Sequence, residues 1–185
     1  MTIGNRNILA KTVSPFGASI SLDIENSKIF EDIVFSIAKR FTIGASATVD
    51  IVIDPTSCNC GFLVFLPIAL KAFQAGPINI DFYFGVNSDE DGTLWGSSNR
   101  LNTSSTTSGL TVRLNPTIND VGTKLPPEFA IYSDGTPAMA TLGGESKDDL
   151  VFVARQDGKY MFRFINQEAS IAQAHASFNW FEVPT

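Results

Sequence analysis

The chain has few charged residues, a single histidine and only two cysteines. Of its 185 residues, 17% are charged, against roughly 25% in ordinary soluble domains. One histidine cannot supply a cupin-type metal site, and two cysteines cannot build a disulfide framework. The formal net charge of -6 opposes binding to nucleic acid, because such binding needs many Lys and Arg side chains against the phosphates.

Long apolar runs are also missing. The longest candidate, residues 62–72, is interrupted by Pro67 and Lys71 and falls short of the roughly 18 apolar residues that span a bilayer. The N-terminus has no basic segment followed by an apolar stretch, so we expect no secretory signal and no membrane partner. A protein made in the cytosol is expected to keep Cys58 and Cys60 as reduced thiols.

The length fits one domain with its own core. Phe is the commonest aromatic residue, with 15 copies against 3 Tyr and 2 Trp, which favours a large buried surface within the chain or between subunits. Residues 1–17 contain Pro15 and Gly17 and show little periodicity. We therefore predict an N-terminal arm or edge strand over 1–17 and a single β-sandwich domain over 18–185.

Strand periodicity is clearest at Ile78, Ile80, Phe82 and Phe84, where apolar side chains occupy every second position and are predicted to be buried together. Further predicted strands cover 18–25, 33–41, 48–54, 61–66, 110–114, 129–132, 150–154, 160–165 and 174–183. The only helix candidate is residues 67–75. About ten strands without a crossover helix predict an all-β, antiparallel β-sandwich, jelly-roll-like in topology, with at most one short helix.

An acidic turn follows the strand over 78–84. Its oxygen-bearing residues match the first, third, fifth and seventh positions of a calcium-binding loop: Asn87, Asp89, Asp91 and Thr93. The twelfth position is Ser98, where an EF-hand has a bidentate Glu, so an EF-hand is excluded. A looser calcium site and a solvated turn both remain open.

Catalytic and cofactor motifs are incomplete. Cys58-Asn-Cys60 lacks the Cys-x-x-Cys spacing, and His175 lies 115 residues after Cys60, so no zinc site is predicted. No Gly-x-Ser-x-Gly elbow is present, and the pair Asp23 and Glu25 fits a solvated strand edge. We expect no enzyme activity and no cofactor, with His175 at a surface or interface.

Trp95 lies in the polar segment 87–102, near Asn87, Asp89 and Asn99. An exposed tryptophan beside amide and carboxylate groups can stack on a sugar ring. The segment 87–102 is therefore a candidate for binding cell-surface glycan.

Four segments of the chain carry a resemblance: the run 51–84, the turn 87–93, the stretch 111–116 and the terminal stretch 178–184. With the loose N-terminal arm, they resemble small virion structural proteins of tailed bacteriophages. That resemblance implies a β-sandwich subunit that forms homo-oligomers, often trimers, and attaches to major capsid or tail proteins.

The expected function is a noncatalytic virion component, assembled in the host cytoplasm, with capsid decoration or cement ahead of the other roles. The alternative is a tail or baseplate fitting, or a receptor- or glycan-binding module that uses residues 87–102. The candidate partner-binding residues are Ile8 and Phe16 in the arm and Trp95 in the polar segment.

Overall fold

The structure is a computed structural model. It describes residues 10–13, 19–22, 33–58, 60, 62–65, 68–73, 78–101, 104–131, 138–142 and 152–183. Within these ranges every regular element is a β-strand. The strands pair antiparallel and form two seven-stranded sheets and one two-stranded sheet. The predicted all-β antiparallel fold is confirmed. The described residues contain no helix that could span a membrane.

The strands fall into three groups. One large sheet contains β4 (Thr48–Asp54), β7 (Ile78–Ser88), β8 (Thr93–Trp95), β10 (Thr111–Leu114), β11 (Ile118–Asp120), β12 (Thr123–Ile131) and β15 (Lys159–Asn166). The other large sheet contains β3 (Val34–Ile43), β5 (Phe62–Phe65), β6 (Ile68–Phe73), β9 (Ser98–Asn99), β13 (Ala138–Leu142), β14 (Phe152–Ala154) and β16 (Ala172–Val183). The small sheet pairs β1 (Ala10–Val13) with β2 (Ser19–Leu22).

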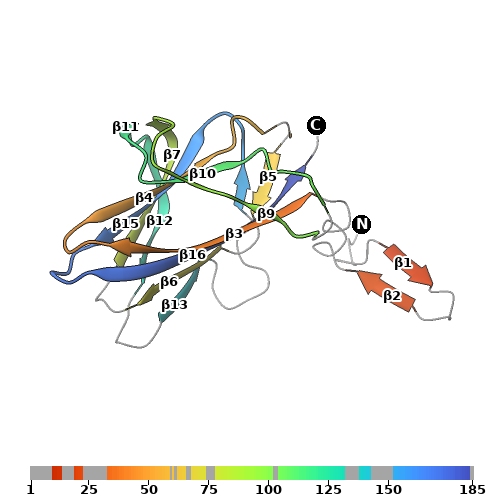
Figure 1. The fold of residues 1–185 in the computed structure, drawn as a ribbon, viewed down its shortest axis with the longest axis horizontal. Coiled ribbons are helices and arrows are strands. Elements are labelled where there is room, and N and C mark those ends of the chain that lie inside the picture. Colours follow the sequence, from red (N-terminus) through yellow and green to blue (C-terminus); the bar gives the residue numbers. More distant parts are fainter. Residues whose placement is uncertain are drawn as a thin grey trace, which may run out of the picture.

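The strand pairing has the winding of a jelly roll (Figure 1). Four antiparallel pairs join early strands to late ones: β3 with β16, β4 with β15, β6 with β13, and β7 with β12. These four pairs form one long antiparallel ribbon. Rolling up that ribbon gives the order β12-β7-β15-β4 in one sheet and β13-β6-β16-β3 in the other. This is the eight-stranded topology of jelly rolls, and β8 to β11 are inserted between its fourth and fifth strands.

Aromatic side chains fill the space between the two sheets. On β15, Phe162 stacks on Phe82 with ring centroids 4.6 Å apart and meets Phe178 of the opposite sheet at 5.7 Å. Phe164 of β15 similarly meets Phe41 of β3 at 5.1 Å. Because side chains alternate along a strand, these residues at every second position form one continuous core.

The predicted burial along β7 is confirmed for three of the four residues. Ile78, Ile80 and Phe82 are buried, whereas Phe84 is partly buried at the edge of the core. The β7–β15 register shifts between Lys159 and Tyr160, beside the positive φ of Gly85. This irregularity ends the regular inward alternation of β7 at Phe84.

The predicted helix over 67–75 is wrong. Residues 68–73 form β6, which pairs with β13 on one side and with β16 on the other. An Ala- and Leu-rich segment has helix propensity, but pairing on both sides satisfies its backbone groups in the sheet. Tertiary context therefore overrides local propensity here.

The N-terminal hairpin of β1 and β2 belongs to neither large sheet. Figure 1 shows it projecting from one end of the sandwich. The strand predicted over 18–25 exists as β2, but its described partner is β1 rather than a sandwich strand. The described part of this N-terminal region is thus an arm-like hairpin that extends past residue 17.

Candidate functional site

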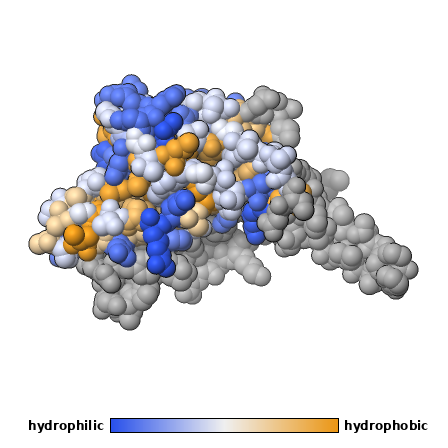
Figure 2. Space-filling model, viewed as in Figure 1, coloured by the Kyte–Doolittle hydropathy of each residue, from blue (hydrophilic) through white to orange (hydrophobic). Residues whose placement is uncertain are grey.

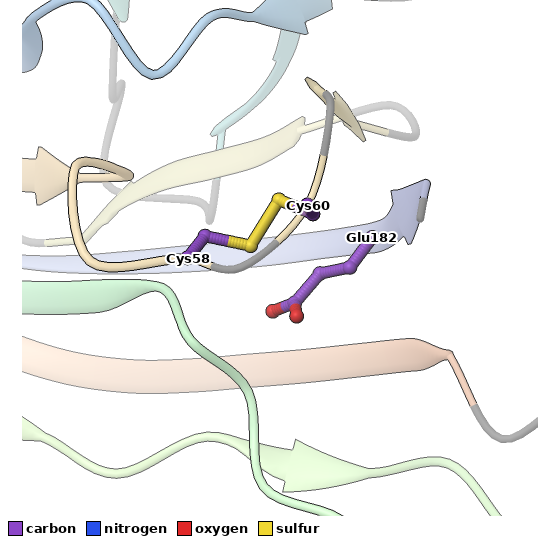
Figure 3. Close-up of side chains that lie close together, drawn as sticks. All are labelled: Cys58, Cys60 and Glu182. Carbon is purple, nitrogen blue, oxygen red and sulfur yellow. A yellow bond between two sulfur atoms is a disulfide. The ribbon is translucent and has the colours of Figure 1, made fainter. Parts of the chain in front are cut away.

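A disulfide and a partly buried carboxylate lie together at the end of the sandwich that carries β5 and the C-terminus (Figure 1). Cys58 follows β4, Cys60 precedes β5, and Glu182 is near the end of β16 (Figure 3). The two sulfurs are bonded, with an S–S distance of 2.11 Å and 5.3 Å between the Cα atoms. The expectation of reduced thiols is therefore wrong, because the turn brings the two Cα atoms within the range that a disulfide bridges.

A tight turn after β4 places Cys58. The Oδ1 atom of Asp54 accepts hydrogen bonds from the backbone N–H and the hydroxyl of Thr56, at 2.9 and 2.6 Å. The backbone N–H of Cys58 then donates to the carbonyl of Pro55 at 3.0 Å. Burial alone would raise the pKa of Asp54, but the hydrogen bonds from Thr56 and the nearby Lys159 outweigh it and lower that pKa. An ionised Asp54 thus fixes the turn.

Four donors surround the cluster. The carboxylate of Glu182 accepts hydrogen bonds from the Gly109 backbone N–H at 3.1 Å, the Trp180 indole N–H at 3.4 Å and the Ser108 hydroxyl. The amide of Gln156 donates to the carbonyls of both cysteines and lies 3.5 Å from the sulfur of Cys60. These groups favour negative charge at the centre of the cluster.

Close packing leaves no room for a side chain at position 109. A Cβ atom on Gly109 would lie 2.7 Å from the Cα of Cys58, closer than such atoms approach in proteins. The hydroxyl of Ser57 also donates to the carbonyl of Gly109 at 2.9 Å. The segment 108–110 is therefore held directly against the disulfide loop.

The disulfide contributes little to stability by loop closure. It joins residues with a sequence separation of 2, so the closed loop holds three residues. Chain-entropy bookkeeping for a loop of that size gives about 1.6 kcal/mol, the low end for disulfides. Both cysteines are nevertheless buried, with 5% and 2% of their surfaces exposed. Stability alone does not explain why the pair is buried beside a carboxylate.

The three ligand atoms of Cys58, Cys60 and Glu182 all lie within 4.8 Å of one another. In the part of the chain that the structure describes, they are the one group of three or more His, Cys, Asp or Glu residues close enough to share an ion. Two sulfurs and a carboxylate suit zinc, once the sulfurs are present as thiolates.

The acidic turn after β7 joins two inserted segments. Both carboxylate oxygens of Asp91 accept hydrogen bonds from Thr117, one from its backbone N–H and one from its hydroxyl, each at 2.6 Å. These hydrogen bonds lower the pKa of Asp91. Asp89 accepts a hydrogen bond from the side-chain amide of Asn119 at 2.8 Å. The turn therefore holds the β10–β11 connection.

The four calcium candidates are spread along this turn. Asn87 pairs in register with Asp120 of β11, and Thr93 begins β8. The carboxylate of Asp91 is directed to Thr117 in the β10–β11 connection, and that of Asp89 to Asn119 of β11. Calcium binding here stays a prediction.

Trp95 is buried, so its predicted exposure is wrong. It is 6% exposed, and its ring lies 5.9 Å from that of Phe41 in the core. The cause is the pairing of Trp95 with Val112 in β10, which fixes the alternation of β8. The outward position belongs to the neighbouring Leu94, which is 58% exposed.

Three predicted residues remain: His175, Ile8 and Phe16. His175 is on the face of β16 opposite Phe178 and Trp180, as predicted, in register between Arg40 of β3 and Lys71 of β6. Ile8 and Phe16 lie outside the described residues.

Sequence reasoning missed the site because its parts are far apart in the chain. Glu182 follows Cys60 by 122 residues, and Gln156 and Ser108 come from two further connections. The closely spaced cysteines were the only available signal, and they pointed away from a metal because the spacing is not Cys-x-x-Cys.

No family model matches the chain, and no curated protein matches it by sequence. Two solved structures of the VP2 protein of infectious bursal disease virus align with it weakly. A point mutant in derived particles shares 8% identity with a TM-score of 0.20, and the subviral particle shares 11% with a TM-score of 0.18. Each alignment covers 97% of this chain but only 45% and 47% of the VP2 chains, so this chain spans less than half their length. TM-scores this low assign neither a family nor a function to this chain.

Proposed function

We propose that the chain is a noncatalytic structural subunit of a virion, and specifically an oligomeric capsid decoration protein of a tailed bacteriophage. The observation that supports this best is the jelly-roll winding, with its four pairs of early and late strands. Viral capsid domains, lectins and cupins recur on this architecture. Because a fold does not fix a function, the choice among these classes depends on individual residues.

Cupins and lectins, the other jelly-roll classes, are less well supported by the residues of this chain. A cupin metal site takes several histidines, and the sequence has His175 alone. The sugar-stacking candidate of the sequence, Trp95, packs inside the sandwich and offers no accessible aromatic face. The structural role therefore has the better support.

The N-terminal hairpin suggests how subunits associate. An isolated two-stranded hairpin is marginally stable in water and needs further packing. The pairing of β1 and β2 includes no strand of either large sheet. A neighbouring copy of the chain would supply the missing packing, and the arm would link subunits into a trimer.

Three large apolar side chains among the described residues are exposed on the body. Leu94, Val153 and Ile171 are 58%, 47% and 62% exposed. Figure 2 shows apolar areas interspersed with hydrophilic ones over the described surface. Single exposed apolar residues are common on monomers, so the proposed association rests on the N-terminal hairpin.

The first test is the oligomeric state. The full chain and a variant lacking residues 1–22 are compared by size-exclusion chromatography with light scattering over a range of concentrations. We expect a trimer for the full chain and a folded monomer for the shortened one, since the deletion leaves the eight-stranded winding intact. A full chain that stays monomeric at high concentration would refute the association.

The second test is particle composition. Virions purified from a culture that makes the chain naturally are quantified by mass spectrometry. A fixed copy number relative to the major capsid protein is expected for a decoration subunit. A chain that is found only in the particle-free supernatant would refute the virion role.

A further inference from the structure

We infer that Cys58, Cys60 and Glu182 form a zinc site that opens when the disulfide is reduced. In the oxidised chain the two sulfurs are bonded to each other and cannot bind a metal as thiolates. In the reduced chain the two thiolates and the carboxylate supply three ligands, and water supplies the fourth. This inference is independent of the proposed virion role.

The distances fit a tetrahedral ion. A zinc centre with Zn–S bonds of about 2.3 Å holds its two sulfurs roughly 3.8 Å apart. The three ligand atoms already lie within 4.8 Å of one another. Once the S–S bond is broken, the two sulfurs are free to separate, and small side-chain rotations complete the geometry.

The surrounding donors suit a negatively charged ligand set. Gly109 and Trp180 donate backbone and indole hydrogen bonds to Glu182, which orient its carboxylate. The amide of Gln156 lies 3.5 Å from the sulfur of Cys60. Hydrogen bonds of this kind orient ligands and tune metal affinity. A carboxylate and two thiolates carry three negative charges, so the site with Zn²⁺ bound keeps one net negative charge. The donors around it stabilise that charge.

The chemistry balances with an external dithiol. The dithiol transfers two electrons and two protons to the disulfide, giving two thiols on the chain and a cyclic disulfide on the reductant. Zinc then binds as the two thiol protons pass to solvent. Because the disulfide closes such a short loop, its loss is compatible with a folded chain.

The experiment is a zinc titration of the full chain by calorimetry. One sample is kept oxidised, and the other is reduced with a dithiol that is then removed under argon. We expect one zinc ion per reduced chain and none at this site in the oxidised chain. Cobalt added in place of zinc should give a thiolate-to-metal charge-transfer band in the reduced sample alone.

Two variants test the ligand assignment. Glu182→Gln should weaken zinc binding roughly 10-fold or more, because the amide is a poorer ligand. Glu168→Gln removes an exposed carboxylate from the β15–β16 turn and should leave binding unchanged. Circular dichroism on each sample, with and without zinc, reports whether the fold is kept.

Three results would overturn the inference. They are a folded, reduced chain that binds no zinc, a Glu182→Gln variant that binds as tightly as the natural chain, and a reduced chain that is unfolded and does not refold with zinc. The first result would show that the reduced cysteine pair does not bind zinc, and the second that Glu182 is not a ligand. The third would show that the reduced chain does not hold the site in a folded state.

Discussion

The core aromatic Phe162 provides a sharp test of the two-sheet packing. It lies on β15, between β4 and β7, and its side chain is fully buried. Its ring stacks on Phe82 within the sheet at 4.6 Å and meets Phe178 across the sandwich at 5.7 Å. Removing the ring therefore opens a cavity that both sheets line.

Phe162→Ala should lower the free energy of unfolding by about 4 kcal/mol, from the lost transfer energy and the cavity together. In a chain of this length that loss corresponds to a fall in Tm of about 8–16 °C. The measurement is urea unfolding followed by circular dichroism, with the slope of the transition checked for a constant value. The matched control is Phe181→Ala on the outward face of β16, where a partly buried ring should cost roughly half as much. Equal losses for the two variants would refute the packing.

Three further predictions address the turns and the inserted strands. Because the folded pKa of Asp54 is lowered, its stabilisation is present above the unfolded value of 3.8 and is lost as pH falls through the folded pKa. Asp54→Asn should therefore flatten the acid limb of a stability–pH profile, and an unchanged acid limb would contradict the role of this carboxylate. In a Trp180→Phe variant the remaining Trp95 should resist acrylamide quenching, and strong quenching would contradict its burial. Gly122→Ala should destabilise the chain by about 1–3 kcal/mol in thermal unfolding, since the glycine has φ +70° and a Cβ there would lie 2.3 Å from a backbone oxygen of β7.

Strands with strong alternation could be predicted from the sequence. The predicted range 48–54 coincides with β4, and the ranges 160–165 and 174–183 lie within β15 and β16. In each case one face is buried in the core, so the two-residue period of hydrophobicity appears directly in the sequence. The antiparallel sandwich class was also predictable, because many strands without a crossover helix exclude a parallel βαβ sheet.

Short inserted strands could not be predicted in the same way. β8, β9 and β11 contain only two or three residues each, too few to show a period. Trp95 illustrates the consequence. It lies in a polar stretch whose sequence is typical of a loop. Its side chain is directed into the core because the residue pairs with Val112 of β10. Burial of an isolated apolar residue depends on a partner strand that is remote in sequence.

The position of the cysteine cluster explains how its covalent state can change in a folded chain. The jelly roll depends on the pairs β3–β16, β4–β15, β6–β13 and β7–β12. Cys58 and Cys60 lie in the connection between β4 and β5, outside these pairs. Glu182 lies one residue beyond the last pair of β16 with β3 and is opposite Leu63 of β5. Breaking the disulfide therefore frees a short connection and leaves the four pairs in place. It follows that reduction should leave the far-ultraviolet circular dichroism of the chain unchanged while it creates the zinc ligands, which separates a local redox change from unfolding.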